Sequence, residues 1–538
     1  MEKPVHLPQT ASDYIDAVIK KMRYRKKIRL EVRQELADHF TDALADCKND
    51  DERQTLAQEL IAEFGDAQLL GTLLCRGKKR CRPWWKTACI RLFQAVGIVF
   101  VLVLVYLGWF FSGKPVITAN YLERMNQQVK PIADDSQNAW PYYKQAAEKY
   151  IEPNDKEFDF SPRHLSVEEQ PVIRQAISNN QESLELTRQG NQKPYYWQVY
   201  RTGENKNQDM ITMLMPHLGT YRGLSHLFCW QAILEAEQGN MQNAFDQTLE
   251  GYSFGQHLRG PNTTLIEQLV AVAIEAQTTK TIRMLLDENI QGIDAPLLDS
   301  IRKRFEEKVA KENFTVSFEA EKLFFYDELH RSFTQSQIGK SHLYIQRVGQ
   351  IGMVMGGDGS NGFSRWFRFL FTHPDREKTR KTVDRFYDEL IRLTAKTPAS
   401  LRNEGIDIDK RGKEIASNNF LLQVLAPALG KVSPVAYRIQ ADSYATLTII
   451  AIMQHYKTYN TYPDSLDAMV QAGLMKNLPL DPFSDKPLVY RKTGDGFALY
   501  SVGSNFTDDG GVPGADKKNT LWDETGDAVF WPRQVDAQ

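Results

Sequence analysis

The stretch LFQAVGIVFVLVLVYLGWFF, at residues 92–111, decides how this chain of 538 residues is organised. It contains no charged side chain, and Gln94 is its only strongly polar one. Because each helical residue adds about 1.5 Å, a helix of this length spans about 30 Å, which matches the hydrocarbon core of a bilayer. Apolar runs in buried core helices are shorter. The sequence therefore predicts one transmembrane helix between a small N-terminal part and a large C-terminal part.

The residues that flank this stretch predict its orientation. On the C-terminal side, Lys114 is the only basic residue before Arg124. The N-terminal side carries seven basic residues with no acidic residue among them: Arg76, Lys78, Lys79, Arg80, Arg82, Lys86 and Arg91. Because Lys and Arg collect on the cytoplasmic side of a membrane, we expect a cytoplasmic N-terminus and an exported C-terminus. The run lies too far along the chain for a cleavable signal peptide, so we expect a retained single-pass anchor in a bacterial cytoplasmic membrane.

The composition is that of a folded globular protein without a nucleic-acid partner. Hydrophobic residues make up 42% of the chain and the net charge is -2, so the basic footprint of a nucleic-acid-binding protein is missing. Cys229 is the only cysteine beyond the apolar run, so the exported part has no internal disulfide and depends on its core. The basic cluster before the run suits contact with anionic lipid head groups, although a topology signal alone explains it.

Residues 1–78 carry apolar residues at helical spacing within residues 14–22, 32–44 and 56–64, and Gly65 ends the last run. The segment EVRQELADHFTDALADCKNDDERQTLAQELIAEFGDAQLLGTLL, at residues 31–74, resembles the HAAS domains and related prefix domains that bacteria place before a membrane span. The shared features are an EL.DHF.DAL helix, an acidic break and a helix that ends in EFGD. This resemblance implies a role in protein interaction or signalling rather than in catalysis.

Residues 113–430 predict an exported, helix-rich body. Its clearest element is HLFCWQAILEAEQGNMQNAFDQTLEGYSFGQHL at residues 226–258, a helical hairpin with a turn at Gly239 and Asn240. The hairpin resembles a tetratricopeptide-type unit, but no clean second copy occurs at a period of about 34 residues. We therefore expect solenoid-like helix packing without a true repeat array.

No catalytic motif stands out in this body. Three histidines lack the spacing of a zinc motif: His217, His226 and His257. Gly357, Gly359 and Gly362 fit GxGxxG, but they lie between helical patterns rather than between a strand and a helix, which indicates a loop. The sequence leaves open whether two of the many acidic residues converge as the carboxylate pair of a hydrolase.

Residues 431–538 change to a mixed α+β pattern. A long helix at residues 436–459 precedes TYPDSLDAMVQAGLMKNLPLDPFSDKPLVYR and GDGFALYSVGSNFTDDGG, in which residues 488–491 and 497–502 alternate as the strands of a hairpin. This order resembles the periplasmic part of the major pseudopilin of type II secretion, over residues 441–530. A pilin subunit carries its apolar helix directly behind a short leader and continuous with this fold. The apolar run here lies far upstream, so we expect a borrowed pseudopilin-like fold rather than a polymerising subunit.

The pseudopilin family binds calcium in its terminal acidic loop, and the resemblance implies a similar site within residues 501–527. Calcium prefers several hard oxygen ligands gathered in one loop. The predicted ligands are Asp508, Asp509 and Asp516. The alternative is a solvated turn rich in Gly and Asp.

The sequence thus predicts a mainly α protein. Its parts are a cytoplasmic helical bundle at residues 1–78, a basic juxtamembrane segment and transmembrane helix at 79–112, an exported helical body at 113–430, partly tetratricopeptide-like, and a small α+β module at 431–538. The combination resembles large single-pass membrane proteins of planctomycete-type bacteria that come without an established activity. We expect a non-catalytic binding, scaffold or signalling protein that contacts the bilayer and a protein partner. An accessory of a secretion or pilus-like machine and an exported hydrolase are the alternatives.

Overall fold

The computed structural model describes residues 6–80, 84–153, 166, 168–203, 209–260, 262–335, 341–347, 350, 373–426, 429–494, 496–514 and 521–533. The chain divides into two compact units, residues 1–110 and residues 111–538. The structure is mainly helical, with small sheets and one helix that is long and apolar enough to cross a membrane. The predicted fold class is confirmed at this level.

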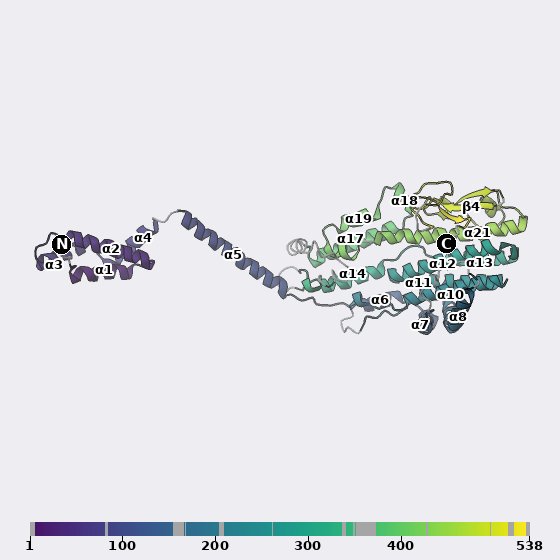
Figure 1. The fold of residues 1–538 in the computed structure, drawn as a ribbon, viewed down its shortest axis with the longest axis horizontal. Coiled ribbons are helices and arrows are strands. Elements are labelled where there is room, and N and C mark those ends of the chain that lie inside the picture. Colours follow the sequence, from purple (N-terminus) through teal and green to yellow (C-terminus); the bar gives the residue numbers. More distant parts are fainter. Residues whose placement is uncertain are drawn as a thin grey trace. The chain divides into compact units, whose positions relative to one another are not determined.

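The first unit begins with a bundle of four helices (Figure 1). They are α1 (Gln9–Lys21), α2 (Lys26–Ala43), α3 (Asp50–Phe64) and α4 (Ala67–Arg80). Their apolar faces meet in one cluster around Val18, Val32 and Phe40, which are at most 1% exposed. The Asn49 side chain caps α3 by accepting a hydrogen bond from Glu52 N, and Gly65 follows α3 with a φ of 71°. The apolar runs predicted as helices all lie in this bundle.

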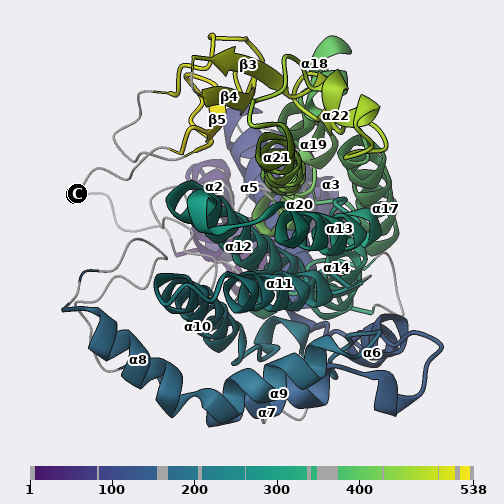
Figure 2. The same cartoon turned by 90° about the vertical axis from the view of Figure 1, so that its right-hand side faces the viewer.

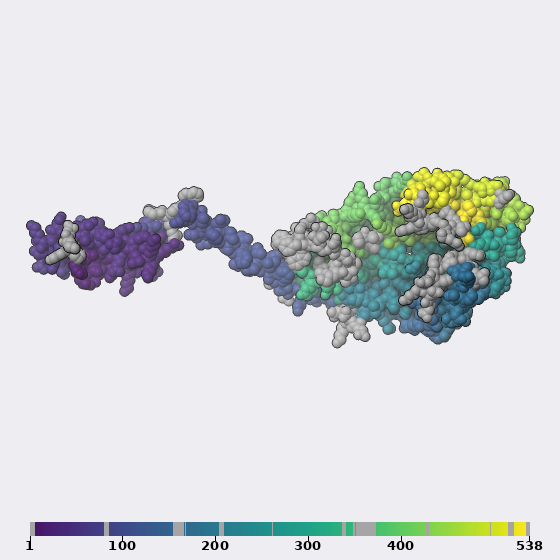
Figure 3. All heavy atoms as spheres, viewed as in Figure 1, coloured from purple at the N-terminus to yellow at the C-terminus, as the bar shows by residue number. Residues whose placement is uncertain are grey.

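Helix α5 (Trp84–Ser112) carries the apolar run without interruption. None of the residues in its most apolar stretch is buried, and Phe93 and Leu102 are 78% and 61% exposed. No other described segment covers this stretch (Figure 3). An apolar surface of this kind is stable only in another apolar medium, and a helix satisfies all its backbone hydrogen bonds there. The structure is therefore consistent with a single-pass membrane protein.

The second unit is a helical body with small antiparallel sheets (Figure 1). Its helices are α6 (Tyr121–Val129), α7 (Trp140–Lys149), α8 (Gln170–Asn179), α9 (Gln181–Asn191), α10 (Leu218–Glu237), α11 (Met241–Leu258), α12 (Leu265–Asn289), α13 (Ala295–Lys311), α14 (Glu319–Ser332), α17 (Arg376–Thr394), α18 (Pro398–Asn403), α19 (Ile408–Ala416), α20 (Phe420–Leu425), α21 (Val432–Tyr459) and α22 (Asp467–Gln471). Short 3-10 turns at Asp135–Gln137, Met210–Thr212, Ile290–Gly292 and Leu429–Lys431 connect some of them.

The helices of the body stack in layers, which Figure 2 shows end-on. Helices α10 and α11 form the predicted hairpin, and Gly239 turns between them with a φ of 81°. Helix α12 packs against both and begins with a capping box, in which Thr264 and Glu267 satisfy each other's backbone N–H groups. Helix α21 lies next to α12 and α13 on one side and the strands on the other (Figure 2).

The C-terminal strands confirm the predicted hairpin and add a strand to it. β3 (Val489–Thr493) pairs with β4 (Gly496–Ser501), which pairs with β5 (Ala528–Trp531), and β1 (Leu480–Asp481) pairs with β2 (Lys486–Pro487). β5 escaped prediction because its four residues are all buried and therefore show no alternation. The sheet shares one hydrophobic cluster with α12, α13 and α21, represented by Phe530, Leu285 and Ile449. The domain limits at residues 78, 112 and 430 stay predictions.

A buried ion pair joins α12 to α21 within this cluster. Arg283 Nη1 lies 2.8 Å from Asp442 Oδ1, and the two side chains are 6% and 3% exposed. Arg283 Nη1 also donates to Thr446 Oγ1 at 2.6 Å, and the Thr279 hydroxyl donates to Asp442. Because both charges have left water, each depends on the other for compensation.

We predict that Arg283→Met destabilises the protein by roughly 3–5 kcal/mol, because it leaves the Asp442 carboxylate buried without a cation. Urea titration of the purified protein, followed by circular dichroism, measures this free energy of unfolding. The double variant Arg283→Met/Asp442→Leu should recover most of the loss. Lys303→Met is the matched control, since it breaks an exposed pair with Asp299 and should cost at most about 1 kcal/mol. Equal effects of the two single variants would contradict the prediction.

Candidate functional site

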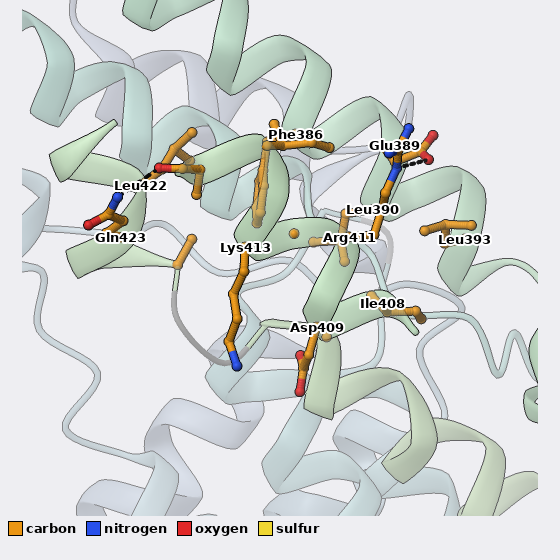
Figure 4. Close-up of a pocket in the computed structure, with 15 residues that line it drawn as sticks. Phe386, Glu389, Leu390, Leu393, Ile408, Asp409, Arg411, Lys413, Leu422 and Gln423 are labelled. Atoms are coloured by element: carbon orange, nitrogen blue, oxygen red, sulfur yellow. Dashed lines mark hydrogen bonds and ion pairs between the residues drawn. The ribbon is translucent and has the colours of Figure 1, made fainter. Parts of the chain in front are cut away.

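A pocket between α17, α19 and α20 is the best candidate for a binding site in the described part of the chain (Figure 4). Its volume is about 320 Å³, and pockets for small ligands begin at about 300 Å³. The wall is mainly apolar, with these side chains in it: Phe386, Leu390, Leu393, Ile408, Ile415, Ala416, Leu422 and Ala426. The pocket therefore suits a small apolar group rather than a polar metabolite.

Local sequence features build this pocket from short helices. Side chains of Asp375, Asp407 and Asn419 accept hydrogen bonds from first-turn N–H groups of α17, α19 and α20, which defines where each helix begins. Gly412 faces the ring of Phe386, and a Cβ atom there would lie 3.2 Å from that ring. The absence of a side chain at this position lets α19 approach α17 while the space beside it remains open.

Four charged side chains line the pocket, and two of them form an ion pair with each other. Arg411 Nε lies 3.2 Å from Glu389 Oε1 (Figure 4). Arg411 Nη1 also lies 3.3 Å from Glu414 Oε2. Hydrogen bonds from Arg392, and then from Arg411, hold the pKa of the Glu389 carboxyl below its ordinary value. Asp409 and Lys413 extend from α19 on the other side of the pocket (Figure 4). The rim of the pocket therefore carries side chains of both signs.

The predicted calcium loop is partly described. Asp508 accepts hydrogen bonds from Tyr500 Oη at 2.8 Å and Gly510 N at 2.9 Å, and Arg491 Nη2 lies 3.3 Å from it. The hydrogen bond from Tyr500 is the main cause that lowers the pKa of the Asp508 carboxyl. Asp509 accepts from Asn505 Nδ2 at 2.6 Å. Asp516 lies outside the described residues, as does the GxGxxG segment.

Among the described residues of the chain, no three His, Cys, Asp or Glu side chains gather as a metal site. Asp527 nevertheless lies near the loop: it accepts from Gly511 N at 2.7 Å, and its pKa is raised by burial and by the charges of Asp509 and Asp508. A nearby cation would relieve that repulsion between carboxylates. The calcium site stays a prediction that rests on the pseudopilin resemblance.

If the loop binds calcium, the metal should stabilise the protein by about 1.4 kcal/mol at a free concentration about tenfold above its Kd. We expect Asp508→Asn and Asp509→Asn each to remove this gain, because each deletes a hard anionic ligand. Asp467→Asn, on the exposed side of α22, is the matched control. Calorimetry and thermal unfolding provide the measurements, and the absence of both heat and thermal shift at millimolar calcium would rule the site out.

The structure buries several carboxylates that the sequence left unassigned. Glu275 and Glu312 lie on either side of Arg259, whose Nη1 and Nε are each 3.3 Å from one of them. Burial raises the pKa of both carboxyls, and their side chains are 0% and 3% exposed. Because the Arg259 guanidinium lies between the two carboxyls and compensates their charge, this arrangement holds helices together.

A second buried pair, Glu267 and Glu321, lies at the N-terminus of α12. Tyr200 Oη and Tyr196 Oη donate to Glu267 at 2.5 and 3.2 Å. Glu321 Oε1 accepts from Leu265 N at 2.6 Å, whereas its buried Oε2 has no hydrogen-bond partner among the described residues. The positive end of the α12 dipole partly offsets the two carboxyls. The spacing of Thr264 and Glu267 fits a capping box and could have indicated part of this site.

Comparisons of the chain with protein-family models, with curated proteins and with solved structures find no match.

The Glu321 carboxyl should make stability depend on pH. Burial raises its pKa to about 7, with a smaller contribution from Glu267. The Tyr387 side chain also lies near this carboxyl. Because the pKa of Glu321 is higher in the folded than in the unfolded protein, folding takes up a proton between these two pKa values. The stability that Glu321 contributes is therefore complete below pH 4.5 and is lost as the pH rises through about 7.

Between pH 5 and pH 8 the parent protein should lose free energy of unfolding as Glu321 ionises. We expect Glu321→Gln to reduce this loss by up to about 3 kcal/mol, because the amide cannot ionise. Urea titrations at several pH values measure it. The control Glu319→Gln changes an exposed carboxyl in the first turn of the same helix, α14, and should leave the slope unchanged. Parallel slopes for the parent and Glu321→Gln would contradict the assignment.

Proposed function

We propose that this chain is a membrane-anchored binding protein: α5 spans a bacterial cytoplasmic membrane, and the body at residues 111–538 binds a protein partner without catalysis. The single observation that carries the binding role is the apolar pocket between α17, α19 and α20. The charge asymmetry around α5 supports a cytoplasmic N-terminal bundle and an exported body.

The chemistry of the body supports binding rather than hydrolysis. A glycosidase-type mechanism needs two carboxyl groups that flank a site open to substrate and water. The buried pairs at Glu275 and Glu312 and at Glu267 and Glu321 are instead occupied by protein groups: an arginine in the first, and hydroxyl and backbone donors in the second. Their raised pKa values follow from burial and from the packing of helices.

The size and rim of the pocket support one kind of occupant, an apolar side chain presented by a peptide or protein. A volume of about 320 Å³ accepts one large side chain but not a two-chain lipid. Buried apolar anchors of this kind carry much of the binding energy in protein interfaces. The backbone of a bound peptide would remain outside the pocket, where Asp409 and Lys413 offer charged groups of both signs to its polar atoms.

We expect labelled peptides with a single Leu or Phe between polar residues to bind the purified protein, as measured by fluorescence anisotropy. Ala416→Phe should weaken this binding by at least about tenfold, because its ring occupies the space that an anchor worth about 1.5–3 kcal/mol would fill. The probe is a defined set of such peptides and their Ser-substituted counterparts.

The matched control is Ala395→Phe, which adds the same ring at the exposed end of α17, away from the pocket. Thermal unfolding confirms that each variant is folded. Equal affinity of the parent and of a folded Ala416→Phe would refute the pocket as the binding site. Equal affinity of the Leu and Ser peptides would refute the apolar anchor.

A further inference from the structure

Helix α4 has an outer face whose leucines the fold leaves exposed. Its inner face packs on α1: a Cβ atom at Gly71 would lie 3.0 Å from Val18 O, and Leu70 and Leu74 belong to the core of the bundle. Leu69 and Leu73, on the opposite side, are 61% and 52% exposed. Nothing in the described bundle covers these two side chains, although they lie one helical turn apart and present a common apolar surface.

Basic residues continue the same face. Arg76 follows Leu69 and Leu73 at helical spacing, and Arg76 and Lys79 are both exposed. By contrast, Lys78 lies toward the bundle, where its Nζ is 2.9 Å from Glu35 Oε1. No acidic residue occurs between Asp66 and Glu123. The outer face of α4, made of Leu69, Leu73, Arg76 and Lys79, is therefore apolar and positively charged.

Chain length limits how far this face can lie from the membrane. Helix α4 ends at Arg80 and α5 begins at Trp84, so the connection reaches at most about 14 Å when fully extended. Near the start of α5, Lys86 lies 5.2 Å from the ring centroid of Trp85, a residue type that favours the membrane interface. If α5 spans a bilayer, as proposed above, the C-terminal end of α4 lies within reach of the head groups.

We propose that the outer face of α4 docks on the bilayer surface. Leu69 and Leu73 enter the interface between head groups and acyl chains, while Arg76 and Lys79 contact the phosphates of anionic lipids. Amphipathic helices bind membranes in this way, with an apolar face in the interface and basic residues beside it that reach the head groups. Each basic residue near an anionic surface strengthens the attraction, which salt screens. The docking would hold the N-terminal bundle against the membrane instead of letting it move freely on its connection.

The test places a photoreactive benzophenone amino acid at Leu73 in the full-length protein, reconstituted in vesicles of phosphatidylcholine with or without phosphatidylglycerol. Mass spectrometry measures the yield of lipid adducts after illumination. We expect adducts at Leu73 to exceed those of the same amino acid at Gln58, an exposed position on α3. The excess should be largest with phosphatidylglycerol. It should fall by about fivefold for each cation removed in Arg76→Gln and Lys79→Gln.

Two controls separate this proposal from the one on which it rests. Lys20→Gln with Lys27→Gln removes two exposed charges elsewhere on the bundle and should leave the adduct yield at Leu73 unchanged. The benzophenone group at Val101, within α5, reports on the span: lipid adducts there support it, and their absence overturns it. Adducts at Val101 with no excess at Leu73 overturn the docking alone. Adducts between Leu73 and a second protein chain also overturn it, because they identify a protein interface.

Discussion

The exposed apolar surface of α5 is the constraint on which the rest of this structure depends. Within residues 92–105, eleven large apolar side chains are exposed. Burying one such side chain is worth about 1.5–3 kcal/mol, so moving all of them from water into a bilayer would gain more than the 5–15 kcal/mol by which a typical domain is stable. The helix is therefore long and apolar enough to cross a membrane. The bundle before it and the body after it must then each fold around a core of their own.

The body meets this requirement with packing and buried polar contacts rather than with cross-links. Its only cysteine, Cys229, is fully buried, and burial raises the pKa of its thiol to about 11. Along α12, Glu267, Glu275 and Arg283 follow one another at eight-residue steps, and each meets a partner from a different part of the chain. Such contacts add little net stability, but an unpaired charge in the core is costly, so they select one alignment of the helices over shifted ones. The hydrophobic cluster supplies the stability, and the polar contacts make the packing specific.

The sequence predicted those features of the fold that local patterns determine. The apolar run of α5, the hairpin of α10 and α11 around Gly239, and the strands β3 and β4 all carry signals within a short window. The pocket between α17 and α19 could not be predicted, because it depends on how Phe386 and Gly412 meet across two helices. The buried carboxylates were missed for the same reason: Glu275 and Glu312 look like surface charges until Arg259 is placed between them. Strand β5, at 528–531, lacks alternation because both of its faces are buried.

Folding explains the position of most apolar residues in this chain, so the exceptions carry the functional information. Scattered exposed leucines are ordinary on protein surfaces, and so are single cavities. The outer face of α4 differs because its leucines and arginine share one stripe and because its connection to α5 leaves it little distance from a bilayer. The pocket of the body differs because it lies between capped helices, two of which meet closely where Gly412 faces the ring of Phe386. The first exception matches the chemistry of a lipid surface, and the second matches a single apolar side chain. Under the two proposals, lipids would hold the bundle at the membrane, and the body would select a partner by the shape of that partner's surface.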